Sequence, residues 1–114
     1  MKKFLVLYKA SRSGFEQMKK ATPEQQQQGM QMWMDWSKKA MAAKAIADMG
    51  GPLGKSARVS KDGVASDATN DLGGFGVMQA ESREALAALM TDHPHFHAEG
   101  ATIEIIEVMA IPGM

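Results

Sequence analysis

The stretch Lys3–Lys9, KFLVLYK, decides the fold class of this chain. Its central residues, Phe4–Tyr8, are apolar or aromatic without a break, whereas a strand with one solvated face alternates apolar and polar residues. The stretch therefore predicts a β-strand that is covered on both faces. The run is far shorter than the roughly 20 residues that cross a bilayer, and Lys9 follows it where a signal peptide would end in small residues. We accordingly expect a soluble, cytoplasmic protein without a membrane partner.

The composition indicates a single folded domain over residues 1–114. Hydrophobic residues make up 45% of the chain and charged residues 23%, which is typical of a globular core rather than of disorder. The absence of cysteine excludes disulfides, thiol catalysis and cysteine-ligated metals. The formal net charge of +0 divides into 12 Lys+Arg against 4 Asp+Glu over residues 1–61 and 1 Arg against 9 Asp+Glu over residues 62–114. Because the basic residues are dispersed and no aromatic-rich strand accompanies them, we expect no nucleic-acid partner.

The remaining elements follow from capping residues and from chain breakers. Thr22 and Gln25 form a capping box around Pro23, which starts a helix. We expect this helix to run to about Asp48 and to stop at Gly50–Pro52. The other expected segments are a polar connection over 10–21, strands over 52–59 and 63–66 with a turn at 61–63, a loop over 67–71, a strand over 73–79, a helix capped by Ser82 and ended at 92–94, and a strand over 101–111.

The order β-α-β-β-α-β, with a hairpin-like middle, describes the ferredoxin-like fold of the α+β class, with a four-stranded antiparallel sheet and both helices on one sheet face. The strand over residues 3–9 has no polar face to give to water, so the second face of the sheet needs a cover. The long predicted helix is apolar on two sides, which also favours self-association. We therefore predict a homodimer in which two sheets pack face to face as a dimeric α/β barrel.

Six short motifs carry a family resemblance. They are Lys3–Tyr8, Gly51–Leu53, Arg58–Val59 before Asp62–Gly63, Leu72–Phe75, Asp92–Pro94 and Ile103–Val108. In this order and spacing they resemble the YCII-related domain family, in its DGPF branch, over almost the whole chain. The resemblance implies the ferredoxin-like fold and the dimeric barrel. It implies little about a reaction, since most members have no assigned activity, although a few relatives dehalogenate or isomerise ring-derived intermediates of aromatic degradation.

The chain also departs from the pattern that this resemblance implies. Family members proposed to be enzymes pair a His of the first long helix with an Asp after the second helix. Asp92 matches that Asp, but the His position falls near Met34, and no His precedes His93. The Asp-Gly-Pro-Phe motif of the branch is replaced at Asp67–Asn70. The acid–base pair of the family is therefore not carried over intact.

The most unusual local feature is HPHFH at His93–His97. Three imidazoles at alternate positions share one side of an extended segment, where they would suit a metal ion, but Pro94 favours a turn that scatters the rings, and we predict no metal. The remaining interpretations are a structural loop and acid–base use of His93 or His95. In the second of these, Asp92 accepts a ring N–H, which fixes the tautomer and raises the basicity of the imidazole.

Four further residues are candidates for lining a small-molecule cavity. They are Tyr8 at the end of the first strand, Trp33 and Asp35 in the long helix, and Glu104 in the last strand. Glu104 and Glu107 are three residues apart and face opposite sides of a regular strand, so one of them would turn towards a cavity. The simpler interpretation is core packing for Tyr8 and solvation for the carboxylates.

Two functions from different classes remain open. In the first, the chain is a cofactor-independent enzyme that acts by proton transfer on a small aromatic or lactone-like molecule, with Asp92, His93 and His95 as catalytic residues. In the second, a non-catalytic homodimer binds a small ligand or a partner protein. The loss of the helix His favours the second function, whereas the retained Asp92–Pro94 favours the first.

Overall fold

The apolar run forms an inner strand of the sheet in a computed structural model of the chain, which describes residues 1–68 and 70–113 and, over residues 65–68, only the backbone. The sheet has the order β2-β5-β1-β6, and every pairing is antiparallel. Its four strands are β1 (Lys2–Lys9), β2 (Ile46–Pro52), β5 (Leu72–Ala80) and β6 (Thr102–Glu107).

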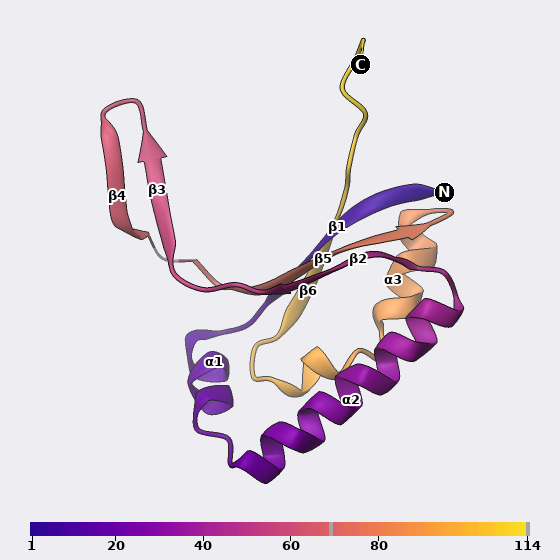
Figure 1. Cartoon of the computed structure of the whole chain (residues 1–114), viewed down its shortest axis with the longest axis horizontal. Coiled ribbons are helices and arrows are strands. Elements are labelled where there is room, and N and C mark those ends of the chain that lie inside the picture. The colour runs from indigo at the N-terminus through magenta and orange to yellow at the C-terminus, as the bar shows by residue number, and fades with distance from the viewer. Residues whose placement is uncertain (69, 114) are drawn as a thin grey trace.

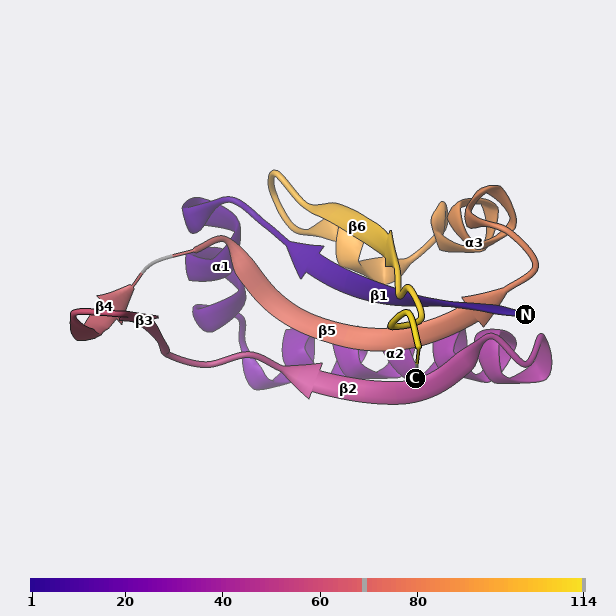
Figure 2. The same ribbon diagram turned by 90° about the horizontal axis from the view of Figure 1, so that it is seen from above.

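The helices all lie on one face of this sheet (Figure 1, Figure 2). They are α1 (Arg12–Lys19), α2 (Pro23–Ala42), α3 (Arg83–Met90) and the short 3₁₀-helix η1 (Pro94–His97). The strand order and the one-sided helix layer are those of the ferredoxin-like α+β fold, which confirms the predicted fold class. Over the described residues no helix combines the length and the hydropathy that a membrane span needs.

The core lies between the sheet and the helices. Along β1, the side chains of Phe4, Val6 and Tyr8 alternate towards the helices and are buried. The whole buried cluster consists of Phe4, Val6, Tyr8, Trp36, Ala40, Met78, Leu86 and Met90. Opposite Tyr8, strand β5 places Gly74, where an added Cβ would lie 3.5 Å from the Tyr8 ring; opposite Val6 it places Gly76, where a Cβ would meet the backbone of β2.

The other face of the sheet carries an apolar patch without a covering layer, and we call it the open face. Leu5 and Leu7 of β1 lie there, half-buried, beside their register partners on β5 and β6. The open face consists of Leu5, Leu7, Phe75, Val77 and Ile106. The continuous apolar run of β1 therefore places apolar side chains on both faces of the sheet, and one of these faces packs on the helices.

The predicted end of the long helix is wrong. Helix α2 ends at Ala42, and Lys44 takes a left-handed conformation with a φ of 57°. The amide of Ala45 bonds the carbonyl of Ala40 at 2.9 Å, which closes the helix. Residues 46–52, expected to be helix and breaker, form β2 instead, because they pair with β5 from Ile46 opposite Met78 onwards. Pairing in the sheet outweighs the helical spacing of the apolar residues.

Four other boundaries differ from the expectation. The strand expected over 52–59 begins only at Ser56, as β3 (Ser56–Ser60), and Pro52 belongs to β2 instead. The predicted polar connection contains α1, whose first turn is capped by the Ser11 hydroxyl accepting from the Gly14 amide at 3.1 Å. The last strand ends at Glu107 rather than near residue 111. In the expected loop over 67–71, the first two residues belong to the backbone of β4. Thr69 lies outside the described residues, and so do the side chains of residues 67 and 68, which belong to the segment that replaces the DGPF motif.

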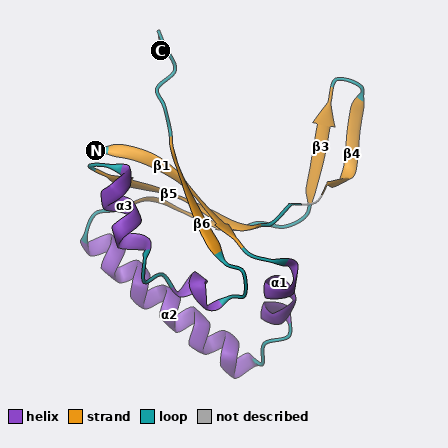
Figure 3. Ribbon diagram, turned by 180° about the vertical axis from the view of Figure 1, so that it is seen from behind, coloured by secondary structure: helices purple, strands orange, loops and turns teal. Residues whose placement is uncertain are grey.

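A two-stranded hairpin projects from the sheet. Its strands, β3 (Ser56–Ser60) and β4 (Gly63–Ala68), pair with each other around the predicted turn at Lys61–Gly63. The hairpin rises on the side of the open face, away from the helices, and the segment after β6 leaves the sheet on the same side (Figure 1, Figure 3).

Candidate functional site

Five aromatic rings from three parts of the chain meet under the end of β1, and we call them the ring cluster. They are Tyr8 of β1, Trp33 and Trp36 of α2, His93 before η1 and His95 within η1. The centroid of the His93 ring lies 4.2 Å from that of Trp36, 4.4 Å from Trp33 and 5.0 Å from Tyr8. His93 is thus the centre of the cluster.

The chain places His93 there by a capped turn after α3. The amide of His93 donates to the carbonyl of Met90 at 3.1 Å, and Pro94 starts η1. The Nδ1 atom of His93 accepts a hydrogen bond from the amide of His95 at 2.9 Å, so the imidazole acts as the N-cap of η1. Because Nδ1 accepts, the neutral ring carries its proton on Nε2.

His93 is only 2% exposed. Burial, with His95 acting in the same direction, lowers the pKa of His93 from 6.5 to about 4. The ring is therefore neutral at physiological pH, and its Nε2–H group is a donor. Within the described residues this buried donor has no hydrogen-bond partner, and neither has the buried Nε1–H group of the adjacent Trp36. The Trp36 indole does lower the pKa of the nearby Asp92 slightly, but the two groups do not reach hydrogen-bond geometry.

The other two polar rings have simpler surroundings. His95 is 7% exposed, and its Nε2–H donates to the carbonyl of Lys9 at 2.8 Å, which ties η1 to the end of β1. Burial raises the pKa of Tyr8 to about 12, so its phenol stays protonated. Trp33, with 36% of its surface exposed, is the outermost ring of the cluster.

The predicted hydrogen bond between Asp92 and an imidazole is not formed. Asp92 is exposed, and its carboxylate pairs with the Lys39 ammonium at 2.6 Å. The Lys39 contact lowers the pKa of Asp92. The turn that buries His93 directs the neighbouring Asp92 outwards to α2, so the two side chains of the predicted pair diverge.

Two of the predicted cavity residues also lie away from the ring cluster. Asp35 is exposed and accepts from the Gln31 amide at 2.9 Å. Glu104 lies opposite Leu7 on the side of the open face and pairs with Lys9 at 3.2 Å. The three imidazoles of residues 93–97 do not converge, and no group of three metal-ligating side chains exists in the described part of the chain.

The sequence analysis assigned no role in the site to Trp36 or to Lys39. Trp36 follows Trp33 by three residues, which places both indoles on neighbouring positions of one helix face. Lys39 follows Trp36 by three residues on the same face, where it reaches Asp92. The signal was the pattern Trp33, Trp36 and Lys39 at intervals of three.

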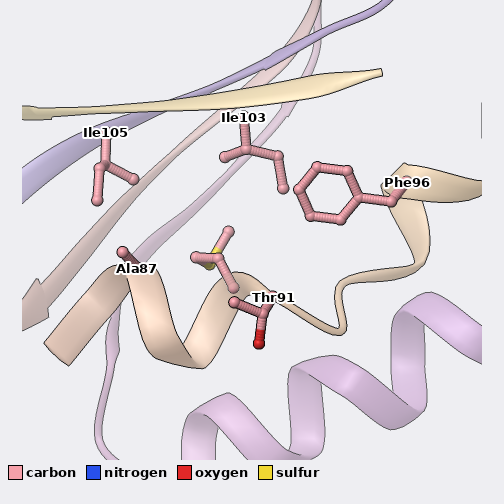
Figure 4. Close-up of a pocket in the computed structure, with 6 residues that line it drawn as sticks. Ala87, Thr91, Phe96, Ile103 and Ile105 are labelled. Atoms are coloured by element: carbon pink, nitrogen blue, oxygen red, sulfur yellow. The ribbon is translucent and has the colours of Figure 1, made fainter. Parts of the chain in front are cut away.

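An apolar hollow of the surface lies beside the ring cluster but apart from it. It has a volume of about 190 Å³ between α3 and the edge strand β6, and Ile103 and Ile105 point into it from the sheet (Figure 4). Its lining is completed by Ala87, Met90, Thr91 and Phe96. The Thr91 hydroxyl donates to the carbonyl of Ala88 at 2.9 Å, and the lining contains no ionisable group. The hollow suits an apolar group and offers no acid–base chemistry.

A second hollow of about 400 Å³ lies at the start of α3. Its charged side chains are already paired with one another, Lys2 with Glu107 at 3.5 Å and Arg83 with Glu84 at 3.4 Å. The ring cluster, by contrast, contains two buried donors that lack partners among the described residues, and we take it as the candidate site.

The comparisons with known proteins agree with this fold. No curated protein matches the sequence. The model of the YCII-related domain family matches residues 4–111, which is nearly the whole chain. The chain therefore belongs to the YCII-related domain family.

Proposed function

We propose that this domain binds a small planar molecule with an acceptor oxygen, and that the neutral imidazole of His93 donates a hydrogen bond to that oxygen. The observation that carries the proposal is the buried Nε2–H group of His93, which has no partner among the described residues. A buried donor without a partner costs about 1–3 kcal/mol, so native proteins rarely keep one without a use. An acceptor on a ligand removes this cost.

Trp33 supports the planar shape of the ligand. It is the exposed ring of the cluster, and it meets Tyr8 and His93 edge-on at centroid distances of 5.1 Å and 4.4 Å. Since His93 is buried, a ligand reaches its Nε2–H by displacing a ring of the cluster, and Trp33 is the ring that is most exposed to solvent. A flat molecule that takes the place of the indole then meets the same two rings.

The chemistry that this arrangement supports is polarisation of a carbonyl group. The Nδ1 atom of His93 is occupied by the His95 amide, and the lowered pKa makes the ring a weak base. Its Nε2–H is a fixed donor that stabilises negative charge on a ligand oxygen. Asp92, paired with Lys39, is not the base of a dyad. The proposed activity is thus a cofactor-independent reaction assisted by a neutral imidazole, with His93 in the main role and His95 positioning η1.

The second candidate is a non-catalytic homodimer, and the open face favours it. Leu5 and Leu7 share this face with apolar side chains of β5 and β6, and no element of the described chain covers them. Packing against the open face of a second copy buries both patches and forms the dimeric α/β barrel. We propose this homodimer for either function. In the non-catalytic form, His93 only caps η1 and fills the core.

A binding experiment tests whether the ring cluster takes a ligand at all. Acetophenone and benzoate are planar probes with an acceptor oxygen, and toluene is the matched probe without one. We expect the first two, at millimolar concentrations, to shift the NMR signals of the His93 ring nitrogens and of the Trp36 indole N–H, whereas toluene leaves these signals in place. The variant Trp33→Ala binds the two oxygen probes more tightly, because no indole has to be displaced.

Absence of these shifts in both the wild type and Trp33→Ala contradicts the ligand proposal. The ring cluster is then structural, and the non-catalytic homodimer is the function that stands. Met30→Ala, at an exposed position of the same helix, is the matched control for changes in α2 itself.

A further inference from the structure

The β3–β4 hairpin, which we call the arm, contacts no other element of the described chain to any appreciable extent. It stands clear of the body on the side of the open face (Figure 1, Figure 3). The radius of gyration is 15.9 Å, whereas a compact domain of this length has about 13 Å. The arm is one of the features that extend the molecule.

The arm carries an apolar pair that nothing covers. Val59 of β3 and Val64 of β4 are register partners, and their side chains are 74% and 68% exposed. A hairpin of two strands is marginally stable in water unless one of its faces packs against another element. The body of its own chain does not supply that element, so the cover comes from outside the chain.

The area needed by a stable dimer indicates a second copy as the cover. The sheet, with four strands, has a footprint of about 450 Å² on its open face. A stable interface buries about 600–1,000 Å² on each partner. In a two-fold arrangement each copy gives an arm as well as receiving one, and the face of the arm that it gives adds about 200 Å². The sheet face and the arm together come to about 650 Å² on each copy, which lies within this range, whereas the sheet face alone lies below it.

The charges of the arm and of the open-face side are complementary in sign. Lys55 at the foot of the arm, together with Arg58 and Lys61, outnumbers Asp62 and Asp67 by one charge, and none of these cations has an ion-pair partner among the described residues. The side of the open face carries three carboxylates against two ammonium groups, namely Asp48, Asp71 and Glu104 against Lys3 and Lys9, and Lys9 already pairs with Asp71 and Glu104. A second copy thus offers the arm an excess of negative charge.

We propose that the arm docks on the open-face side of a second copy of this chain, where the Val59–Val64 pair is buried, and that the two copies exchange arms. This inference rests on the homodimer of the proposed function and adds a segment to its interface. The arm then acts as a clamp that holds the two sheets in register.

The first test is the double variant Val59→Asp/Val64→Asp, measured by analytical ultracentrifugation. We expect the dimer dissociation constant to rise about 100-fold, since two apolar contacts are replaced by buried charges. The far-UV circular dichroism stays that of the wild type, because the arm packs on no element of its own chain. Met30→Asp, an equally drastic change at an exposed site on the helix side, leaves the dissociation constant unchanged.

The outcomes distinguish the arm from the homodimer itself. If the wild type is a dimer and the double variant dissociates with the same constant, the arm inference is overturned and the homodimer remains. A wild type that is monomeric at every concentration overturns both. Leu7→Asp, on the open face, weakens the dimer whether or not the arm takes part, and it serves as the positive control.

A second test keeps the apolar pair nearly intact. The chain contains no cysteine, so Val64→Cys carries a unique attachment point for a photocrosslinker. In a mixture of ¹⁵N-labelled and unlabelled protein, we expect peptides that join the arm of one copy to β5 or β6 of the other. Crosslinks confined to the same copy contradict the exchange of arms.

Discussion

The buried imidazole of His93 makes the stability of this protein sensitive to mild acid. Its pKa falls from 6.5 in the unfolded chain to about 4 in the folded protein. The unfolded state therefore binds a proton at a higher pH than the folded state does. Stability is full above pH 6.5, declines as the pH falls towards 4, and reaches its lower limit below the folded pKa.

The magnitude follows from the two pKa values. The free energy of unfolding falls by about 2 kcal/mol between pH 7.5 and pH 5, and by about 3 kcal/mol at the lower limit. The lowered pKa values of Asp92 and Glu84 act in a separate window, because those carboxylates start from 3.8 and 4.5 in the unfolded chain. Between pH 5 and pH 7.5 the decline thus reports on His93.

The assay is urea unfolding followed by circular dichroism at pH 7.5, 6 and 5. In His93→Phe, a ring remains but does not titrate, so the decline of about 2 kcal/mol disappears. At pH 7.5 the same variant loses the acceptor of the His95 amide but also removes the Nε2–H group, which is unpaired among the described residues. Each of these opposing effects amounts to about 1–3 kcal/mol, so the pH slope rather than the absolute stability is the test. His97→Gln, at an exposed position, keeps the wild-type profile. A flat profile in the wild type, or an undiminished slope in His93→Phe, refutes the reasoning.

Two further predictions concern the packing around the sheet. Leu86 is 0% exposed in the core, so Leu86→Ala lowers the free energy of unfolding by about 2–5 kcal/mol, measured by urea unfolding; Leu53→Ala, at a 40% exposed position, should lower it by less than half as much. Gly50 has a φ of +65°, and a Cβ there meets the backbone of Phe75. Gly50→Ala therefore lowers the free energy of unfolding by at least about 1–2 kcal/mol, which is measured as a lower melting temperature. Gly51→Ala, with open space around its Cβ, has a smaller effect, and equal effects contradict the role given to Gly50.

Local chemistry made much of the fold predictable. The capping box of Thr22 and Gln25 is present as expected, with both hydrogen bonds formed at 3.1 Å and 2.9 Å. The apolar run of β1 and the cap of α3 at Ser82 are confirmed as well. Each of these features depends on residues within a few positions of one another, which is why a single sequence reveals them.

The predictions that were wrong concern features that depend on residues far apart in the sequence. The segment from Ile46 onwards continues the helical spacing, and only its pairing with Met78 on β5 makes it a strand. In the site, Tyr8, Trp33, His93 and His95 meet as rings. Their roles in binding or catalysis stay predictions. The spacing places Lys39 on the helix face of Trp33 and Trp36, but its ion pair with Asp92 depends on how α2 packs against the turn after α3.

The place of β1 in the sheet has a consequence for the order in which the protein folds. Val6 pairs with Gly76, 70 positions along the chain, and with Ile105, 99 positions along. On the ribosome, β1 is the first strand to be made, and it gains both neighbours only after residue 107 has emerged. Until then its apolar run is unpaired and exposed to aggregation. Because both closures span long loops, we expect the domain to fold slowly for its size.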